Sequence, residues 1–360
     1  MPTEAFAALL LLVPLILAAQ DGDGGEGGEP APDPLAPKVQ PAAELIGLEF
    51  TDKEIELMAD ELAGQLASYA ALRAADLPNA VAPAGTFTPL VPGVVVRPHG
   101  VESLVPTPGP PARGSADGPL GPIPFHANPF DSISMLGLHL RSGRISCVEL
   151  TRFYLDRLEA LHPTLECVVT LLPERALAQA AERDAELAEG IDRGPLHGIP
   201  WGAKDLLSVA GAPTTWGAAP YRDQVLDQDA EVVRRLDEAG AVLVAKLSLG
   251  ALAWGDVWFG GTTRNPWNSE QGSSGSSAGS ASAVAAGAVP FAIGSETLGS
   301  LVSPSVRCGV TSLRPSFGRI SRTGAMTLSW SMDKLGPMTR SIEDATLVFD
   351  ALRGPAAEGE

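Results

Sequence analysis

Apolar residues recur at helical spacing in two segments of the chain, each opened by a capping pattern. In the first, Thr51 and Glu54 form a capping box, and the apolar positions that follow are Ile55, Met58, Leu62, Leu66 and Tyr69. In the second, Ser146 and Glu149 form the same pattern, followed by Leu150, Tyr154, Leu158 and Leu161. Each pattern predicts an amphipathic helix, and we expect the second to end at His162-Pro163 because a helix usually stops before proline.

Between residues 167 and 247, short apolar runs alternate with amphipathic segments. The runs at 167–172, 197–207 and 241–247 are typical of buried strands, the second of them with a turn. The segments at 173–190 and 230–240 are typical of helices. This alternation predicts an α/β fold with a mainly parallel sheet.

A Gly/Ser run, GSSGSSAGS, occupies residues 272–280. Alone it would be interpreted as a flexible linker. However, a turn at 265–268 precedes it, and an Ala-rich helical stretch that runs into a short apolar strand follows it directly. Small residues at such a junction let backbone N–H groups face a ligand, so the run is a candidate site.

The N-terminal third of the chain predicts three segments of different character. Residues 1–19 contain the apolar run Ala5 to Ala19, which has the length and small-residue end of a signal peptide, although no Lys or Arg precedes it. Residues 20–48 are a Gly/Pro/acidic tract that predicts a flexible linker, and 49–127 combine the first helix with a Pro-rich extended segment. We expect an exported protein without a stable membrane span, since the run is shorter than about 20 residues. The alternatives are a misassigned start and an uncleaved anchor.

The net charge and the spacing of cysteines and histidines limit the partners and the kinds of site that we expect. The formal charge of −18 disfavours nucleic acid and anionic membranes. Cys147, Cys167 and Cys308 have no metal-site spacing, and three thiols cannot all pair within one chain, so buried free thiols are expected. The histidines likewise lack the spacing of a metal site or of a Ser–His pair, which favours structural or surface positions.

From about Asp131 to Gly354 the sequence resembles the amidase signature family, with the family's segments in the family's order. These segments are PLHGIPWGAKDLLSVAG, AEVVRRLDEAGAVLVAKLSLGALA, NPWN, GSSAGSASAVAAG, GSETLGSLVSPS, CGVTSLRPSFGRISRTGAM and DKLGPMTRSIEDATLVFDAL. The resemblance implies that residues 128–360 form an amidase signature catalytic domain. It also implies a mixed, mainly parallel sheet covered by helices on both faces.

The resemblance further implies a Ser–Ser–Lys triad. The segment G-I-P-x-x-x-K-D places its lysine at Lys204, GSSAGS places the bridging serine, after a cis peptide bond, at Ser276, and the T-G-G-S segment places the nucleophile at Ser300. Lysine accepts a proton only when neutral, so Lys204 must lie where its charge is disfavoured. The backbone N–H groups of Thr297, Leu298 and Gly299 would form an oxyanion hole. No cofactor or metal is implied.

Three of the differences from the family pattern T-D-T-G-G-S-I-R and from its Gly/Ser run bear on the site. Leu298 replaces a glycine, which would reshape the oxyanion hole if that position needs a positive φ. Val302 replaces an arginine, which would leave Glu296 without a cation. Ser274 stands where glycine is common. Family catalytic domains also continue for a hundred or more residues beyond the segment that ends here, so we expect a C-terminally incomplete domain.

The resulting prediction is an exported amidase that hydrolyses a small-molecule carboxylic amide, or an ester, through an acyl-enzyme. One alternative is the glutaminase (A) subunit of a tRNA-dependent amidotransferase, which uses the same triad. Another is a non-catalytic amidase-like binding protein, which the departures from the family pattern favour. The sequence leaves the substrate and the oligomeric state open.

Overall fold

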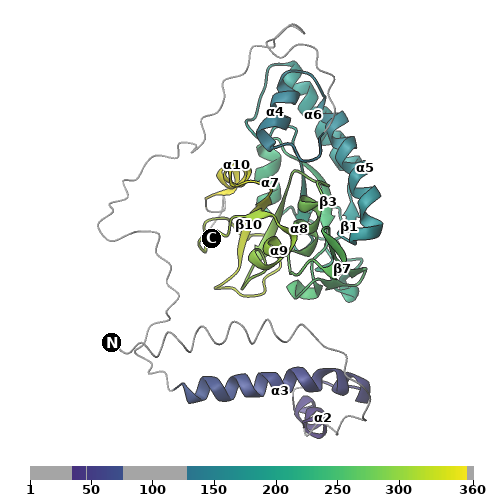
Figure 1. The fold of residues 1–360 in the computed structure, drawn as a ribbon, viewed down its shortest axis with the longest axis vertical. Helices are drawn as coiled ribbons and strands as arrows, with labels where there is room; N and C mark the ends of the chain where they lie inside the picture. Colours follow the sequence, from purple (N-terminus) through teal and green to yellow (C-terminus); the bar gives the residue numbers. More distant parts are fainter. Residues whose placement is uncertain (1–34, 46, 76–127, 355–360) are drawn as a thin grey trace, which may run out of the picture. The chain divides into compact units, whose positions relative to one another are not determined.

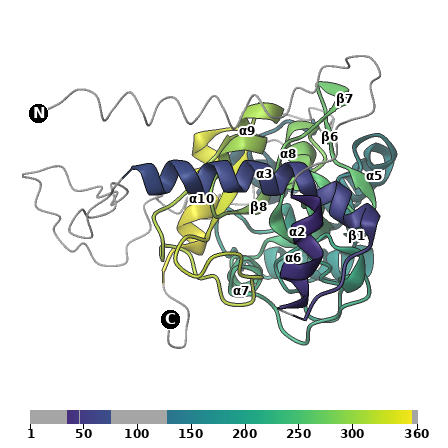
Figure 2. The same cartoon turned by 90° about the horizontal axis from the view of Figure 1, so that it is seen from below.

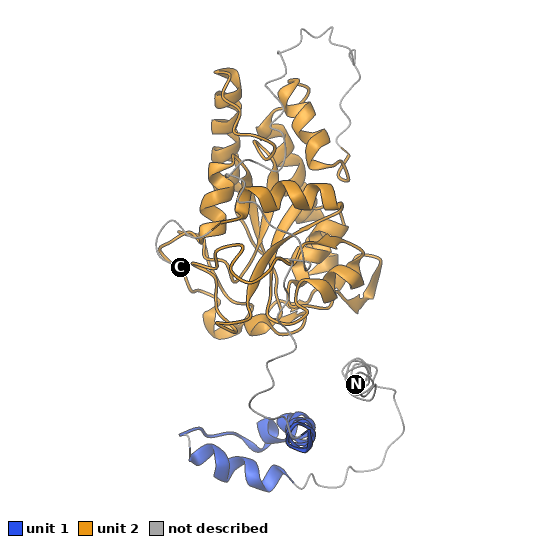
Figure 3. Cartoon of the chain, turned by 90° about the vertical axis from the view of Figure 1, so that its left-hand side faces the viewer, with its two compact units in different colours: residues 1–88 blue, residues 89–360 orange. Residues whose placement is uncertain are grey.

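The computed structural model describes residues 35–45, 47–75 and 128–354. The chain divides into two compact units, residues 1–88 and 89–360 (Figure 3). The predicted signal peptide at 1–19 and the Pro-rich segment of 76–127 lie outside the described residues.

The described residues of the first unit form two helices, α2 (Ala36–Glu44) and α3 (Asp52–Ala74). α2 packs against α3 and runs across its direction (Figure 2). The capping box at the start of α3 is confirmed, because Thr51 N–H donates to Glu54 Oε2 at 2.7 Å and Glu54 N–H donates to Thr51 Oγ1 at 3.4 Å. The linker predicted over 20–48 is wrong for its last part, where Pro37 in the first turn and several alanines suit α2.

The second unit is built on one mixed six-stranded sheet in the order β1-β3-β2-β8-β10-β9 (Figure 1). Parallel pairing joins the three central strands, β3 to β2 and β2 to β8, whereas the outer pairings are antiparallel. The α/β fold with a mixed sheet is therefore confirmed, with its parallel part confined to the centre. The strands are β1 (Val168–Leu171), β3 (Val242–Leu247), β2 (Pro200–Lys204), β8 (Phe291–Glu296), β10 (Lys334–Thr339) and β9 (Thr311–Ser312).

Helices pack against this sheet, α6 and α7 against β3, α8 against β8 and β2, and α10 against β10. Helices α5 and α6 pack against each other, and α5 lies beside β1 (Figure 1). The helices of this unit are α4 (Ile133–Arg141), α5 (Cys147–Leu165), α6 (Pro173–Ala188), α7 (Glu231–Glu238), α8 (Ala278–Ala285), α9 (Val302–Cys308) and α10 (Ile342–Leu352). Short elements connect them: η1 (Ala219–Tyr221), η2 (Ala251–Ala253), the pair β4 (Val257–Trp258) and β5 (Gly261–Thr262), and the pair β6 (Arg264–Asn265) and β7 (Asn268–Gly272).

Helix α5 begins as predicted but ends later. The capping box at Ser146 is formed, with Glu149 N–H donating to Ser146 Oγ at 3.0 Å. The helix then continues through Pro163 to Leu165, and the next residue, Glu166, takes a left-handed conformation with φ 48°. A proline this close to the C-terminus interrupts only the last turn, so it does not set the end of the helix.

The core lies along the central strands, all of whose residues are buried. Trp201 on β2 stacks on Phe291 on β8, with ring centroids 6.1 Å apart. Because β2 residue Ala203 pairs with Lys246 of β3, side chains of Lys204 and Lys246 project from opposite faces of the sheet. Both lysines are fully buried, so the sheet is covered on both faces at this point.

Candidate active site

Lys204 is the last residue of β2, and its amine lies among serine side chains. Lys204 Nζ is 2.9 Å from Ser276 Oγ, 3.0 Å from Ser277 Oγ and 2.9 Å from Ser295 Oγ. It also lies 3.3 Å from the Ser295 carbonyl oxygen. Two of the three predicted triad residues, Lys204 and Ser276, are therefore in direct hydrogen-bond contact.

The surroundings of this amine disfavour its charged form. Lys204 is fully buried, and burial lowers the pKa of its amine to about 7, against a weaker opposing effect of Asp333 and Glu296. Among the described residues, no carboxylate forms an ion pair with it. A lysine in this position can accept a proton near neutral pH.

The Gly/Ser run is not a flexible linker, because it connects the exposed strand β7 to the fully buried helix α8. The peptide bond between Gly275 and Ser276 is cis. Ser276 and Ser277 are buried, and α8 begins directly after them at Ala278. A Cβ atom added to Gly275 would clash with the Gly255 carbonyl oxygen, so glycine is required for the close approach of these two backbones.

Ser300 lies in the loop between β8 and α9, next to the serine pair. The Ser277 N–H group donates to the Ser300 carbonyl oxygen at 3.1 Å, which holds this loop against the start of α8. The loop turns at Gly299, where φ is 89°. The nucleophilic role of Ser300 stays a prediction, and so does the oxyanion hole.

Leu298 replaces a family glycine, and we expected it to strain this loop if that position needed a positive φ. The structure shows no such strain at Leu298. The positive φ belongs to Gly299, and the side chain of Leu298 is 80% exposed. The residue that does adopt a positive φ in place of a family glycine is Ser274, with φ 61°. Its N–H donates to Asp256 Oδ2 at 2.8 Å and its hydroxyl lies 2.7 Å from Ser303 Oγ.

Glu296, the last residue of β8, has a cation despite the valine at position 302. Arg314 Nη1 lies 2.7 Å from Glu296 Oε1. Burial raises the pKa of Glu296, but the hydrogen bond from Arg314 and the backbone N–H groups of Gly299, Leu301 and Val302 outweigh it and hold the pKa below its usual value. The expectation of an unpaired carboxylate is therefore wrong, because a residue distant in sequence supplies the guanidinium. The Gly299 N–H, a predicted oxyanion donor, already has this carboxylate beside it.

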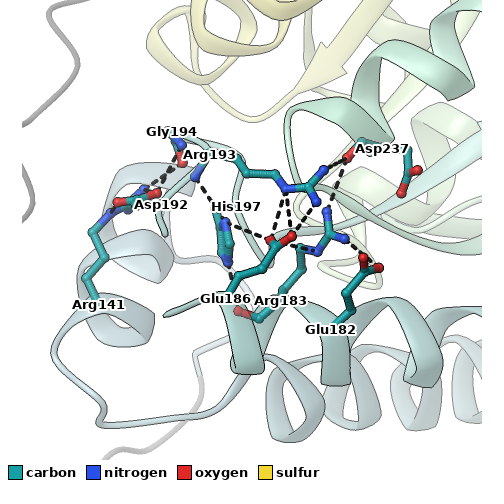
Figure 4. Close-up of polar contacts among 9 residues, drawn as sticks. All are labelled: Arg141, Glu182, Arg183, Glu186, Asp192, Arg193, Gly194, His197 and Asp237. Atoms are coloured by element: carbon teal, nitrogen blue, oxygen red, sulfur yellow. Dashed lines mark hydrogen bonds and ion pairs between the residues drawn. The ribbon is translucent and has the colours of Figure 1, made fainter. Parts of the chain in front are cut away.

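His197 belongs to a polar cluster at the other end of β2, ahead of Pro200 (Figure 4). Its Nδ1 accepts the Arg193 N–H at 3.1 Å, so its Nε2 carries the hydrogen and donates to the Arg183 carbonyl oxygen at 3.0 Å. Burial lowers the pKa of this imidazole, which is therefore neutral at physiological pH. The buried Arg183 is paired with Glu186 at 3.2 Å in the same cluster, which has a structural role.

The cysteines are the other candidates for nucleophilic chemistry that the sequence offers. All three cysteines are free and buried, as predicted, and burial raises the pKa of Cys167 and of Cys308 to about 12. Within the described ranges, no three His, Cys, Asp or Glu side chains gather where they could hold a metal ion. Over those same ranges, no helix combines the length and the apolar character needed to cross a membrane.

The sequence pattern did not identify Ser295, Asp333 and Arg314. Ser295 meets Lys204 because β8 is the parallel neighbour of β2. Asp333 accepts from Thr297 Oγ1 at 2.5 Å, which ties it to the loop that carries Ser300. Pairing of β10 with β8 aligns Lys334 with Glu296 and brings Asp333 to this site, a contact that no local pattern encodes.

A fully buried lysine bonded to serine hydroxyls at the end of a central strand defines the site as one suited to nucleophilic catalysis by serine. The model of the Amidase family matches residues 149–358, and the chain belongs to this family.

The chain is similar to known relatives and to solved structures over part of its length. The chain is 40% identical over 230 residues to the A subunit of the Glutamyl-tRNA(Gln) amidotransferase of Coxiella burnetii, covering 63% of this chain and 47% of that protein. It is similar to the native peptide amidase from Stenotrophomonas maltophilia, with 40% identity, a TM-score of 0.60, and 63% of this chain and 48% of that chain covered. It is also similar to a fatty acid amide hydrolase, at 29% identity and a TM-score of 0.58, with coverage of 61% and 40%. The chain spans about half the length of the curated relatives it matches.

Proposed function

We propose that the chain carries the catalytic machinery of an amidase that cleaves a carboxylic amide through an acyl-enzyme. The observation that supports this most directly is the contact of 2.9 Å between the fully buried Lys204 Nζ and Ser276 Oγ. Ser300 Oγ attacks the carbonyl carbon, its proton passes to Ser276 Oγ, and the Ser276 proton passes to Lys204 Nζ. The same path returns a proton to the amide nitrogen as the C–N bond breaks. Water then releases the acid by the reverse transfers.

Hydrogen-bond accounting at Lys204 supports this direction of proton transfer. The Ser277 hydroxyl donates to the Ser295 carbonyl oxygen at 3.0 Å, so toward Lys204 it can only accept. A neutral amine has two N–H groups and one lone pair. If the N–H groups go to Ser277 Oγ and Ser295 Oγ, the lone pair is left for the proton of Ser276.

Covalent labelling tests the nucleophile. A fluorophosphonate probe reacts with an activated serine, so wild-type protein should label and Ser300→Ala should not. Ser303→Ala is the matched control, since it removes an exposed hydroxyl three residues further along the same segment. Full labelling of Ser300→Ala would place the nucleophile elsewhere. A wild-type protein that neither labels nor hydrolyses any amide or ester would favour the non-catalytic binding protein.

The substrate separates this proposal from its nearest alternative, the glutaminase component of an amidotransferase. Similarity to the Glutamyl-tRNA(Gln) amidotransferases supports glutamine as the amide, whereas similarity to the peptide amidase supports a peptide amide. Rates of ammonia release from glutamine and from a C-terminally amidated peptide distinguish the two. We propose the amidase, and a preference for glutamine that depends on added partner subunits would establish the alternative.

We also propose that the protein is exported, because the run Ala5 to Ala19 has the features of a signal peptide. N-terminal sequencing of protein from its native host should find a start near Gln20. An intact Met1 in protein from the cytosol would contradict export.

A further inference from the structure

The loop that carries Ser300 is closed by a single buried carboxylate. Glu296 precedes the loop, and its Oε2 accepts the N–H groups of Leu301 at 2.9 Å and Val302 at 3.1 Å, which follow it. Both ends of the loop are therefore fixed to the same side chain. Glu296 is fully buried, so its charge must be balanced for the arrangement to persist.

Arg314 makes the ion pair that balances this charge. It follows β9, the edge strand of the sheet, and its guanidinium reaches Glu296 Oε1 at 2.7 Å while its side chain stays 50% exposed. The other charged groups that face Glu296 have different contacts. Lys334, its partner in the β10 register, donates to the Thr297 carbonyl oxygen at 3.2 Å, Lys204 is bonded to serines, and Asp333 accepts from Thr297.

We propose that Arg314 is a positioning residue for the reaction, holding the 297–300 loop and with it Ser300 through Glu296. Arg314 thereby takes the place of the arginine that the family pattern has at position 302. This inference rests on the proposed function for its effect on turnover, but its structural part does not. Val302 is itself bonded to Glu296 through its N–H and is 41% exposed, so an arginine side chain at 302 has room to reach the same carboxylate.

A charge-relocation experiment tests the inference in the 360-residue protein. Arg314→Met should lower kcat/KM by roughly tenfold to 100-fold, the range expected when a reacting group is displaced by up to about 1 Å. Arg314→Lys should retain most of the activity because it keeps a cation. Arg314→Met combined with Val302→Arg should recover most of what Arg314→Met loses. Arg307→Met is the matched control, an exposed arginine on α9, and should match the wild type.

Titration of the Glu296 carboxyl provides a readout that needs no turnover. Carbon-13 NMR of glutamate-labelled protein, assigned with Glu296→Gln, should show the Glu296 pKa raised in Arg314→Met and lowered again in the double variant. A loss of activity caused only by general destabilisation would not be restored by moving the charge to position 302.

Two results would overturn the inference. One is an Arg314→Met protein whose kcat/KM and Glu296 titration both match the wild type. The other is a double variant with a restored Glu296 pKa but no recovery of turnover, since the ion pair would then not position Ser300. If the wild type itself has no activity, the proposed function fails, and the Glu296 titration still decides whether Arg314 holds the carboxylate.

Discussion

Two lysines on neighbouring parallel strands, Lys204 on β2 and Lys246 on β3, differ in what surrounds their amines. Both are fully buried, and they project from opposite faces of the sheet. Lys204 contacts serine oxygens, whereas Lys246 Nζ lies 2.6 Å from Asp205 Oδ1, itself fully buried. Burial lowers the pKa of both amines, but at Lys246 the adjacent carboxylate opposes the effect.

The partner therefore decides what a buried lysine can do. Lys246 also donates to Thr214 Oγ1 at 3.0 Å and to the Pro213 carbonyl oxygen at 3.1 Å, while Asp205 Oδ2 accepts the Thr215 N–H at 2.9 Å. This arrangement satisfies a charged pair and fixes the 213–215 segment to the sheet. The amine of Lys204 is in contact with serine hydroxyls and with no carboxylate of the described residues. This absence of a counter-charge in contact favours the neutral amine that a base requires.

Replacing Lys204 should have the largest effect, and it should fall on activity. Lys204→Met removes the base from a unit of interacting residues, so turnover and probe labelling should fall by about 10⁴-fold or more. The free energy of unfolding should change much less than in Lys246→Met, because no buried carboxylate in contact, among the described residues, is left without its cation and the Ser277 hydroxyl keeps its bonds to the Ser295 backbone. Assays of turnover and denaturant unfolding on the same preparation check both parts. If Lys204→Met is inactive because it is unfolded, Lys204 has a structural role like that of Lys246, and the contrast between the two lysines is wrong.

Lys246→Met should produce the opposite pattern. It leaves Asp205 buried without a cation, and we expect the free energy of unfolding to fall by about 3–5 kcal/mol. Adding Asp205→Asn removes the orphaned charge and should recover part of this loss. Denaturant unfolding of the two single variants and the double variant measures the coupling. Equal stability of Lys246→Met and wild type would mean that the pair contributes nothing.

The sequence predicted the elements and the residues that lie in motifs, but not the partners that the sheet brings together. The capping boxes of α3 and α5 are local, and Lys204 and Ser276 occur in recognisable segments. Ser295 and Arg314 reach the site only because β8 lies beside β2 and β9 lies at the edge beyond β10.

Local sequence patterns also led to wrong predictions where the local preference of the residues is weak and packing against other elements decides the structure. The tract before Glu44 has the composition of a linker, yet its last residues form α2 against α3. Pro163 indicated the end of a helix, yet the helix continues for two residues beyond it. The predicted stripe of α3 is buried only at Ile55, while Leu66 and Tyr69 are exposed.

The low pKa of Lys204 should be visible in the pH dependence of stability. The folded pKa of about 7 lies below the value of about 10.4 for an unfolded lysine, so between these values the unfolded chain binds one proton more. Stability should therefore rise with pH across this window, and the penalty is complete below pH 7. Lys204→Met should remove this rise, whereas Lys53→Met, at an exposed position on α3, should keep it. An unchanged slope in Lys204→Met would assign it to other groups.

The smallest effect is expected from a charge near Lys204 that does not touch it. Asp333 raises the pKa of Lys204, so Asp333→Asn should move the rise of kcat/KM with pH to lower pH by a fraction of a unit. Asparagine keeps an acceptor for Thr297 Oγ1 or for the N–H groups of Leu328 and Ser329, so the loop should stay in place. Asp156→Asn removes the same charge from an exposed position on α5 and should not move the profile. Because the wild-type rise reports the loss of the lysine proton, a shift to higher pH in Asp333→Asn would mean that another group controls it.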